Sequence, residues 1–116
     1  MTAITRLHPN KRFSRAVVHQ GTAYFAGLTA DDWSGDAAAQ TTQTLAKADQ
    51  LLDELGTTRS TLLSATIWLR DMADFPAMNA VWEAWIDPDS PPARATVESN
   101  MAHPDVRVEI QFVAAV

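Results

Sequence analysis

The chain has 116 residues, of which 47% are hydrophobic and 20% charged, a composition typical of one globular domain rather than a disordered segment. Its 14 acidic and 9 basic residues give a net charge of −5, which argues against nucleic acid or an anionic membrane as a partner, since both need a basic surface. The chain has no cysteine, which excludes disulfides, thiolate metal sites and cysteine nucleophiles. With no export signal visible after Met1 and no apolar run long enough to span a membrane, we expect one domain over residues 1–116 in the cytoplasm.

Runs of β-branched and aromatic residues predict three short strands at the start of the chain, over residues 4–7, 15–19 and 22–28. Pro9 ends the first strand, and Gln20–Gly21 forms a hairpin-like break between the other two. Trp33 lies in the loop that follows. It is interpreted either as a lid or subunit contact, or as ordinary packing.

The next element is the clearest helix of the sequence, over residues 36–55. Asp36 is expected to cap its start, and Gly56 stands where a left-handed residue ends a helix. One apolar stripe runs along it, formed by Leu45, Ala48, Leu52 and Leu55. The polar side is expected to hold Gln40, Gln43, Lys47, Gln50 and Glu54. A helix with one apolar face needs a surface to pack on, most economically a sheet.

A central strand is predicted over 62–69, followed by a second helix that Asp74 caps, with Pro76 in its first turn. The apolar face of this helix consists of Phe75, Met78, Trp82 and Trp85. Two strands, 93–98 and 106–113, complete the chain. The pattern predicts an α+β sandwich with both helices on one face of a mixed sheet, so the other face must meet water or a partner.

The last two strands carry polar residues on alternate positions. Arg94, Thr96 and Glu98 point away from the apolar side of the first strand, and Arg107, Glu109 and Gln111 do the same on the second. If the two strands pair through the 99–105 connection, their polar sides coincide. One register sets Thr96 opposite Glu109, and another sets Arg94 opposite Glu109. In either register, Arg94 and Glu109 are expected to share one face.

Such a polar face has three interpretations. It can be a solvated surface with cross-strand ion pairs, each contributing about 0.2–1 kcal/mol. It can be an anion site, in which Arg94 offers a planar fork to a carboxylate while Glu109 handles a proton or orients water. It can also be an oligomer contact. The three histidines, His8, His19 and His103, show no metal-ligand spacing, so no metal site is expected.

Several motifs in this order resemble the RidA (YjgF) family of reactive intermediate deaminases. The most specific ones are Pro92-Ala93-Arg94-Ala95-Thr96-Val97-Glu98 and Val106-Arg107-Val108-Glu109-Ile110 near the C-terminus. Others are Ala39-Gln40-Thr41, Asp71-Met72-Ala73-Asp74-Phe75, Asn79-Ala80-Val81-Trp82, and Ala16-Val17-Val18 leading to Tyr24-Phe25-Ala26-Gly27.

The resemblance implies a homotrimer of chorismate-mutase-like α+β subunits with clefts between neighbouring chains. It implies hydrolysis of 2-imino acids, such as 2-iminobutanoate and 2-iminopropanoate, to 2-oxo acids and ammonia, without metal or organic cofactor. Arg94 matches the arginine that binds the substrate carboxylate, and Glu109 matches the glutamate that activates water. Thr96, Phe13, Gly27 and Asn79 fall at substrate-binding positions.

This chain departs from the family pattern near the cleft. Phe13 replaces a frequent tyrosine, Thr96 replaces a frequent cysteine, and the family's Ser-Gly-Gln reads Ala26-Gly27-Leu28. These changes leave carboxylate binding and water activation in place and bear on the choice of substrate side chain. The alternative is a non-catalytic trimer that uses the same cleft to bind small carboxylates or acts as a chaperone-like surface.

Overall fold

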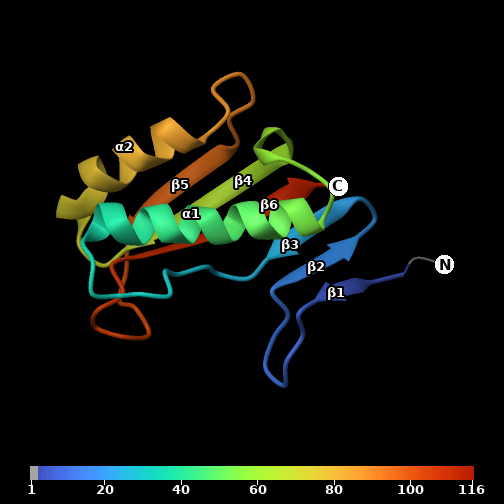
Figure 1. Ribbon diagram of the computed structural model, residues 1–116, viewed down its shortest axis with the longest axis horizontal. Helices are drawn as coiled ribbons and strands as arrows, with labels where there is room; N and C mark the ends of the chain where they lie inside the picture. Colours follow the sequence, from blue (N-terminus) through green and yellow to red (C-terminus); the bar gives the residue numbers. More distant parts are fainter. Residues whose placement is uncertain (1–2) are drawn as a thin grey trace.

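The structure is a computed structural model that describes residues 3–116 as one mixed six-stranded sheet with two helices on one of its faces (Figure 1). The strands are β1 (Thr5–Leu7), β2 (Ala16–His19), β3 (Thr22–Phe25), β4 (Leu62–Leu69), β5 (Ala93–Glu98) and β6 (Val108–Ala115). Their spatial order is β1-β2-β3-β6-β4-β5. The predicted α+β sandwich is therefore confirmed.

The strand pairing differs from the predicted one at the end of the chain. The last strand, β6, lies antiparallel to both β3 and β4, whereas β5 runs parallel to β4 at the sheet edge. The predicted pairing of β5 with β6, in either register, is wrong, because β4 lies between them. The unit β4–α2–β5 is a crossover that places β5 parallel to β4. After β5 the chain enters the sheet as β6 on the other side of β4, so it does not form a hairpin with β5.

Two helices cover the sheet, α1 (Ala37–Glu54) and α2 (Phe75–Trp85), with short 3₁₀ turns η1 (Arg59–Thr61) and η2 (Met72–Asp74) before β4 and α2. Asp36 caps α1 as predicted, since its carboxylate accepts the Ala39 N–H at 2.9 Å. Gly56 follows the helix with a φ of +71°, the left-handed conformation expected there. In the part of the chain that the structure describes, no helix is both long and apolar enough for a membrane span.

The start of α2 corrects one prediction. Asp74 is its N-cap residue, but its side chain makes no capping hydrogen bond. Instead its carboxylate lies 3.4 Å from an Nη of Arg107, while Asp71 caps the preceding turn by accepting the Ala73 N–H. Pro76 lies in the first turn of α2, where its missing N–H is tolerated.

The core lies between the helices and the sheet. Both predicted apolar stripes face it: Leu45, Ala48 and Leu52 of α1 are buried, as are Met78, Trp82 and Trp85 of α2, while Leu55 and Phe75 are partly buried at its rim. Phe112 of β6 is at the centre of the aromatic residues, with ring centroids 6.1 Å from Trp82, 5.7 Å from Trp85 and 6.0 Å from Phe25.

Gln40 of α1 is fully buried, contrary to its predicted place on the polar side of the helix. Its Nε2 lies 3.0–3.2 Å from the carbonyls of Trp33, Gly35 and Asp105, and its Oε1 accepts the Arg107 N–H at 2.9 Å. A buried amide is tolerated when its donors and acceptor are satisfied in this way. Gln40 therefore joins the loop before α1 to the loop before β6.

Candidate functional site

Arg94 lies on the helix-covered face of the sheet, beneath α2. Its position on β5 pairs with Ala65 of β4, a buried core residue, and paired residues of adjacent strands point to the same face. Its Nη1 donates to Oδ1 of Asn79 at 2.8 Å, and its guanidinium carbon lies 5.3 Å from the ring centroid of Trp82 and 5.8 Å from that of Phe75. The two rings and the amide hold the guanidinium against the helix.

Thr96 follows on the same face of β5, where it pairs with Ile67. Its Oγ1 is buried and has no hydrogen-bond partner among residues 3–116. A buried hydroxyl without a partner costs free energy, so in native proteins such a group usually bonds to something else, such as water or a ligand. Thr96 therefore provides an unused polar group one pleat from Arg94.

Glu109 points to the opposite face of the sheet. It pairs with Trp68 of β4, while its neighbours Val108 and Ile110 are buried on the helix side. No hydrogen bond or ion pair engages its carboxylate within the described chain. Burial disfavours its charged form and raises the pKa of Glu109 above the usual value near 4.5. A carboxylate with a raised pKa is a stronger base, as water activation requires.

Gly27 is in contact with the Glu109 carboxylate. Leu28 and Ile110 exchange two backbone hydrogen bonds, of 2.8 and 2.9 Å, which bring the segment after β3 against β6. A β-carbon at position 27 would collide with Oε2 of Glu109. Phe13, which is 54% exposed, lines a hollow together with Gly27. A side chain at position 27 would therefore displace the Glu109 carboxylate, which a sequence motif alone does not reveal.

The predicted site residues thus form two groups on one chain. Arg94, Thr96 and Asn79 gather between β5 and α2, whereas Glu109, Gly27 and Phe13 gather around the end of β3 and β6. The expectation that Arg94 and Glu109 share a face is wrong: through their pairing with β4, Arg94 and Thr96 of β5 face the helices, whereas Glu109 of β6 faces away from them. Phe75 and Trp82, predicted only as core residues, also contact Arg94. The crossover that places an edge strand beneath a helix is the signal that could have identified them.

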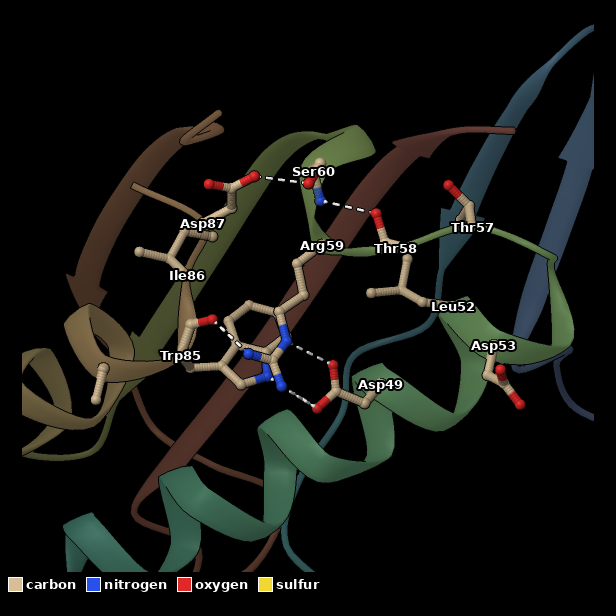
Figure 2. A pocket seen from close by; sticks show the side chains of 11 residues that line it. Asp49, Leu52, Asp53, Thr57, Thr58, Arg59, Ser60, Trp85, Ile86 and Asp87 are labelled. Atoms are coloured by element: carbon tan, nitrogen blue, oxygen red, sulfur yellow. Dashed lines mark hydrogen bonds and ion pairs between the residues drawn. The ribbon is translucent and has the colours of Figure 1, made fainter. Parts of the chain in front are cut away.

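A hollow of about 500 Å³ lies elsewhere, between the C-terminal ends of the two helices and η1 (Figure 2). Figure 2 shows the Arg59 guanidinium over Trp85 and directed at Asp49, to which Nε and Nη2 donate, both at 2.9 Å. Asp49 also accepts the Trp85 Nε1–H at 3.0 Å. The hydrogen bonds that Arg59 donates to Asp49 raise the pKa of Arg59. The charges of Arg59 and Asp49 pair with each other, so we interpret this hollow as part of a structural hydrogen-bond network.

Trp33, which the sequence allows as a lid, a subunit contact or ordinary packing, contacts two residues of its own chain. Its Nε1 donates to the Ala30 carbonyl at 2.7 Å, and its ring centroid lies 4.7 Å from that of His103. The side chain keeps part of one face exposed, at 36%.

The chain is similar in sequence and in structure to known proteins. A family model described as Endoribonuclease L-PSP matches residues 3–116. A RutC family protein from Haemophilus ducreyi is 42% identical over 113 residues, 97% of each chain. A protein named 3-aminoacrylate deaminase RutC, from Acinetobacter baylyi, is 39% identical over 82 residues, which cover 71% of this chain and 64% of that protein. A solved member of the YjgF protein family from Neisseria meningitidis superposes with a TM-score of 0.94 at 39% identity, covering 97% of this chain and 94% of that one.

Proposed function

The chain belongs to the RidA (YjgF) family, and from this premise we propose that it hydrolyses reactive 2-imino and 2-enamino acids to 2-oxo acids and ammonia. The observation that carries the proposal is the division of the site: an anion-binding group at Arg94 and a base at Glu109, on opposite faces of one sheet. The name of the Acinetobacter relative, a deaminase of 3-aminoacrylate, supports the reaction class.

Arg94 binds the substrate carboxylate in this proposal. Asn79 engages one Nη, and no other hydrogen bond or ion pair uses the guanidinium within residues 3–116. The remaining N–H groups can therefore form a bidentate pair with a carboxylate, which fixes orientation as well as affinity. The hydroxyl of Thr96, two residues along β5 on the same face, is an additional donor.

Glu109 activates the attacking water. The protonated imine is already electrophilic, so one base that removes a proton from water suffices for attack on its carbon. The carboxyl group then returns this proton to the nitrogen. As the C–N bond breaks, the carboxylate takes the remaining hydroxyl proton, so that the carbonyl of the 2-oxo acid forms, and this proton passes to the departing ammonia. The balance is R–C(=NH₂⁺)–COO⁻ + H₂O → R–CO–COO⁻ + NH₄⁺. No step needs a metal or organic cofactor.

The two groups meet only if neighbouring copies of the chain combine them, and the proposed assembly is a homotrimer. The sheet face opposite the helices is incompletely covered in one chain, since Tyr24 on β3 is 50% exposed and Val97 on β5 is 44% exposed. If this face of one copy packs against the β5 edge of the next, those side chains are buried and Arg94 of the edge strand is brought toward Glu109.

The description of the family model as an endoribonuclease raises RNA as a second substrate class. An RNA-cleaving site is expected to hold a phosphate backbone with a basic surface, whereas this chain has a net charge of −5. The deaminase proposal therefore has the better support.

The proposal is tested by coupling an amino-acid oxidase or threonine dehydratase to the protein and following the decay of 2-iminopropanoate or 2-iminobutanoate. We expect wild-type protein to accelerate loss of the imine over buffer, with the rate unchanged by a chelator. A chain that accelerates none of several imines would be the non-catalytic binder instead. Its affinity for 2-oxobutanoate, measured by calorimetry, would then show whether the cleft binds small carboxylates.

A further inference from the structure

A hollow with two basic side chains in its wall adjoins the Glu109 half of the site. It has a volume of about 250 Å³, and its wall includes Phe13, Gly27 and the backbone that follows β3. Two basic side chains complete it, Arg15 from the residue before β2 and Lys47 from α1. In a chain with only 9 basic residues, two of them converge on a space next to the proposed general base.

The guanidinium of Arg15 is not used by the fold. Its backbone is held on both sides, because its N–H donates to the Leu7 carbonyl at 2.9 Å and its carbonyl accepts the Ala26 N–H at 2.8 Å. Its side chain is exposed, and no hydrogen bond or ion pair engages it in residues 3–116. A positioned backbone with an uncommitted charged side chain is the arrangement expected of a ligand-binding residue.

Lys47 contributes a second, better-buried charge. Its side chain is 17% exposed, and its Nζ donates to the Thr29 carbonyl and to Oδ1 of Asp31, both at 2.9 Å. The hydrogen bond and charge of Lys47, with a smaller share from Arg15, lower the pKa of Asp31. The Asp31 side chain is 84% exposed, so solvent screens this pair. The ammonium has three donors and can engage a further anion.

Gly27 connects the hollow to the reaction centre. It lines the hollow, and its α-carbon faces the Glu109 carboxylate closely enough to exclude a β-carbon. A substrate whose reacting carbon lies at Glu109 can therefore extend past Gly27 along the Phe13 ring toward Arg15 and Lys47. The methylene groups of such a substrate would lie on the Phe13 ring, and its far end would lie near Arg15 and Lys47.

Resting on the proposed function, we propose that the preferred substrate is a 2-imino or 2-enamino acid whose side chain ends in a second carboxylate, bound by Arg15 and Lys47. Arg94 of the neighbouring copy holds the first carboxylate, and Glu109 acts between the two anchored ends. The bonds made and broken are those of the same hydrolysis. The side-chain carboxylate adds binding and orientation only.

The test compares imines that differ in the second carboxylate, generated by oxidases from glutamate or aspartate and from alanine or 2-aminobutanoate. We expect kcat/KM to be about tenfold higher for the diacid imines, in line with one charge-assisted pair. Arg15→Gln should remove most of this preference and leave the monoacid imines unchanged, while Arg15→Lys keeps part of it. Arg12→Gln, an exposed arginine of the same loop outside the hollow, is the matched control and should change neither.

A binding measurement separates this proposal from the one it rests on. Calorimetry with 2-oxoglutarate and 2-oxobutanoate reports the hollow without any turnover. Weaker binding of 2-oxoglutarate alone in Arg15→Gln supports the diacid site even in a chain without deaminase activity. Equal kcat/KM for both imine classes, with Arg15→Gln matching wild type in rate and in product binding, would overturn the diacid proposal and leave the deaminase proposal standing.

Discussion

Arg94 and Glu109 project from opposite faces of the same sheet, with β4 between their strands. The Arg94 guanidinium lies beneath α2, and the Glu109 carboxylate lies against Gly27 on the other side of the sheet. A small substrate cannot bridge these two groups within a single chain. The first prediction tests the consequence directly.

Mixing two inactive variants should restore activity. Arg94→Ala retains the base and Glu109→Gln retains the carboxylate-binding group, so a cleft between unlike copies can hold one intact half of each. Equal amounts, unfolded and refolded together, should recover about a quarter of wild-type activity, since one interface in four receives the productive combination in a randomly mixed ring. Arg94→Ala refolded with the double variant is the control and should stay inactive. Failure of the first mixture to exceed this control would contradict a site shared between copies.

Replacing Arg94 separates charge from geometry. We expect Arg94→Ala to lower kcat/KM for imine hydrolysis about a hundredfold or more, because a charge-assisted bidentate contact is lost. Arg94→Lys keeps the charge but not the fork, and should recover only a small part of that loss. Circular dichroism and size-exclusion chromatography check that both variants stay folded. Full activity in Arg94→Lys would show that the site needs a positive charge alone.

Gly27→Ala should reduce activity far more than stability, because the added β-carbon displaces the Glu109 carboxylate. The main loss is expected in kcat. Gly56→Ala provides the opposite pattern: its φ of +71° disfavours alanine while no atom lies within 4 Å of the added carbon. That variant should lose about 1 kcal/mol of stability and keep its activity. Thermal melts of both variants measure the loss of stability, and steady-state rates measure the loss of activity.

Glu109 should make the protein less stable as pH rises. Burial raises its pKa in the folded state, so the folded chain binds the proton more tightly than the unfolded chain does. Stability from this group is present at low pH and is lost as pH rises through the folded pKa. Glu109→Gln should therefore melt higher than wild type above that pKa, and the difference should vanish below the usual value near 4.5. The acid limb of the wild-type rate profile should lie above that same value.

Gln40→Met should destabilise the fold without touching the site groups. Methionine has similar volume but leaves the Arg107 N–H and three carbonyls without the partners that Gln40 supplies. We expect a loss of about 2–4 kcal/mol in the free energy of unfolding by urea. Gln50→Met, at an exposed position of the same helix, should change it by less than about 0.5 kcal/mol. A neutral Gln40→Met would show that water replaces these hydrogen bonds.

Local patterns predicted most of the elements and the layer arrangement. The stripes of α1 and α2, the cap at Asp36 and the stop at Gly56 are all properties of residues within one or two turns of each other. The strand over 62–69 and the one over 93–98 agree with the predicted bounds. Other strands differ by a few residues: β3 ends at Phe25, and β6 starts two positions later than predicted.

Long-range pairing was not available from such patterns. Alternation assigns each residue of β5 and β6 to one of two faces, but only the strand pairing shows that the polar side of β5 faces the helices while that of β6 faces away from them. Gln40 looks like a surface residue until the loops that bond to it are placed. Alternation offered Arg94 and Glu109 as an anion site among three interpretations, and the resemblance to the RidA family assigned their roles and added Thr96, Phe13, Gly27 and Asn79. Their division into two groups required the fold.

The strand nearest the C-terminus, β6, lies in the middle of the sheet between β3 and β4. During synthesis, the hairpins of β1–β3 and the crossover of β4 and β5 therefore emerge from the ribosome as separate pieces with a gap between them. Ile110 and Phe112, which fill that gap, are made after the strands on both sides of it. A nascent chain that ends before about position 108 exposes both edges of the gap, so closure of the sheet and any assembly of copies must wait until β6 has been made.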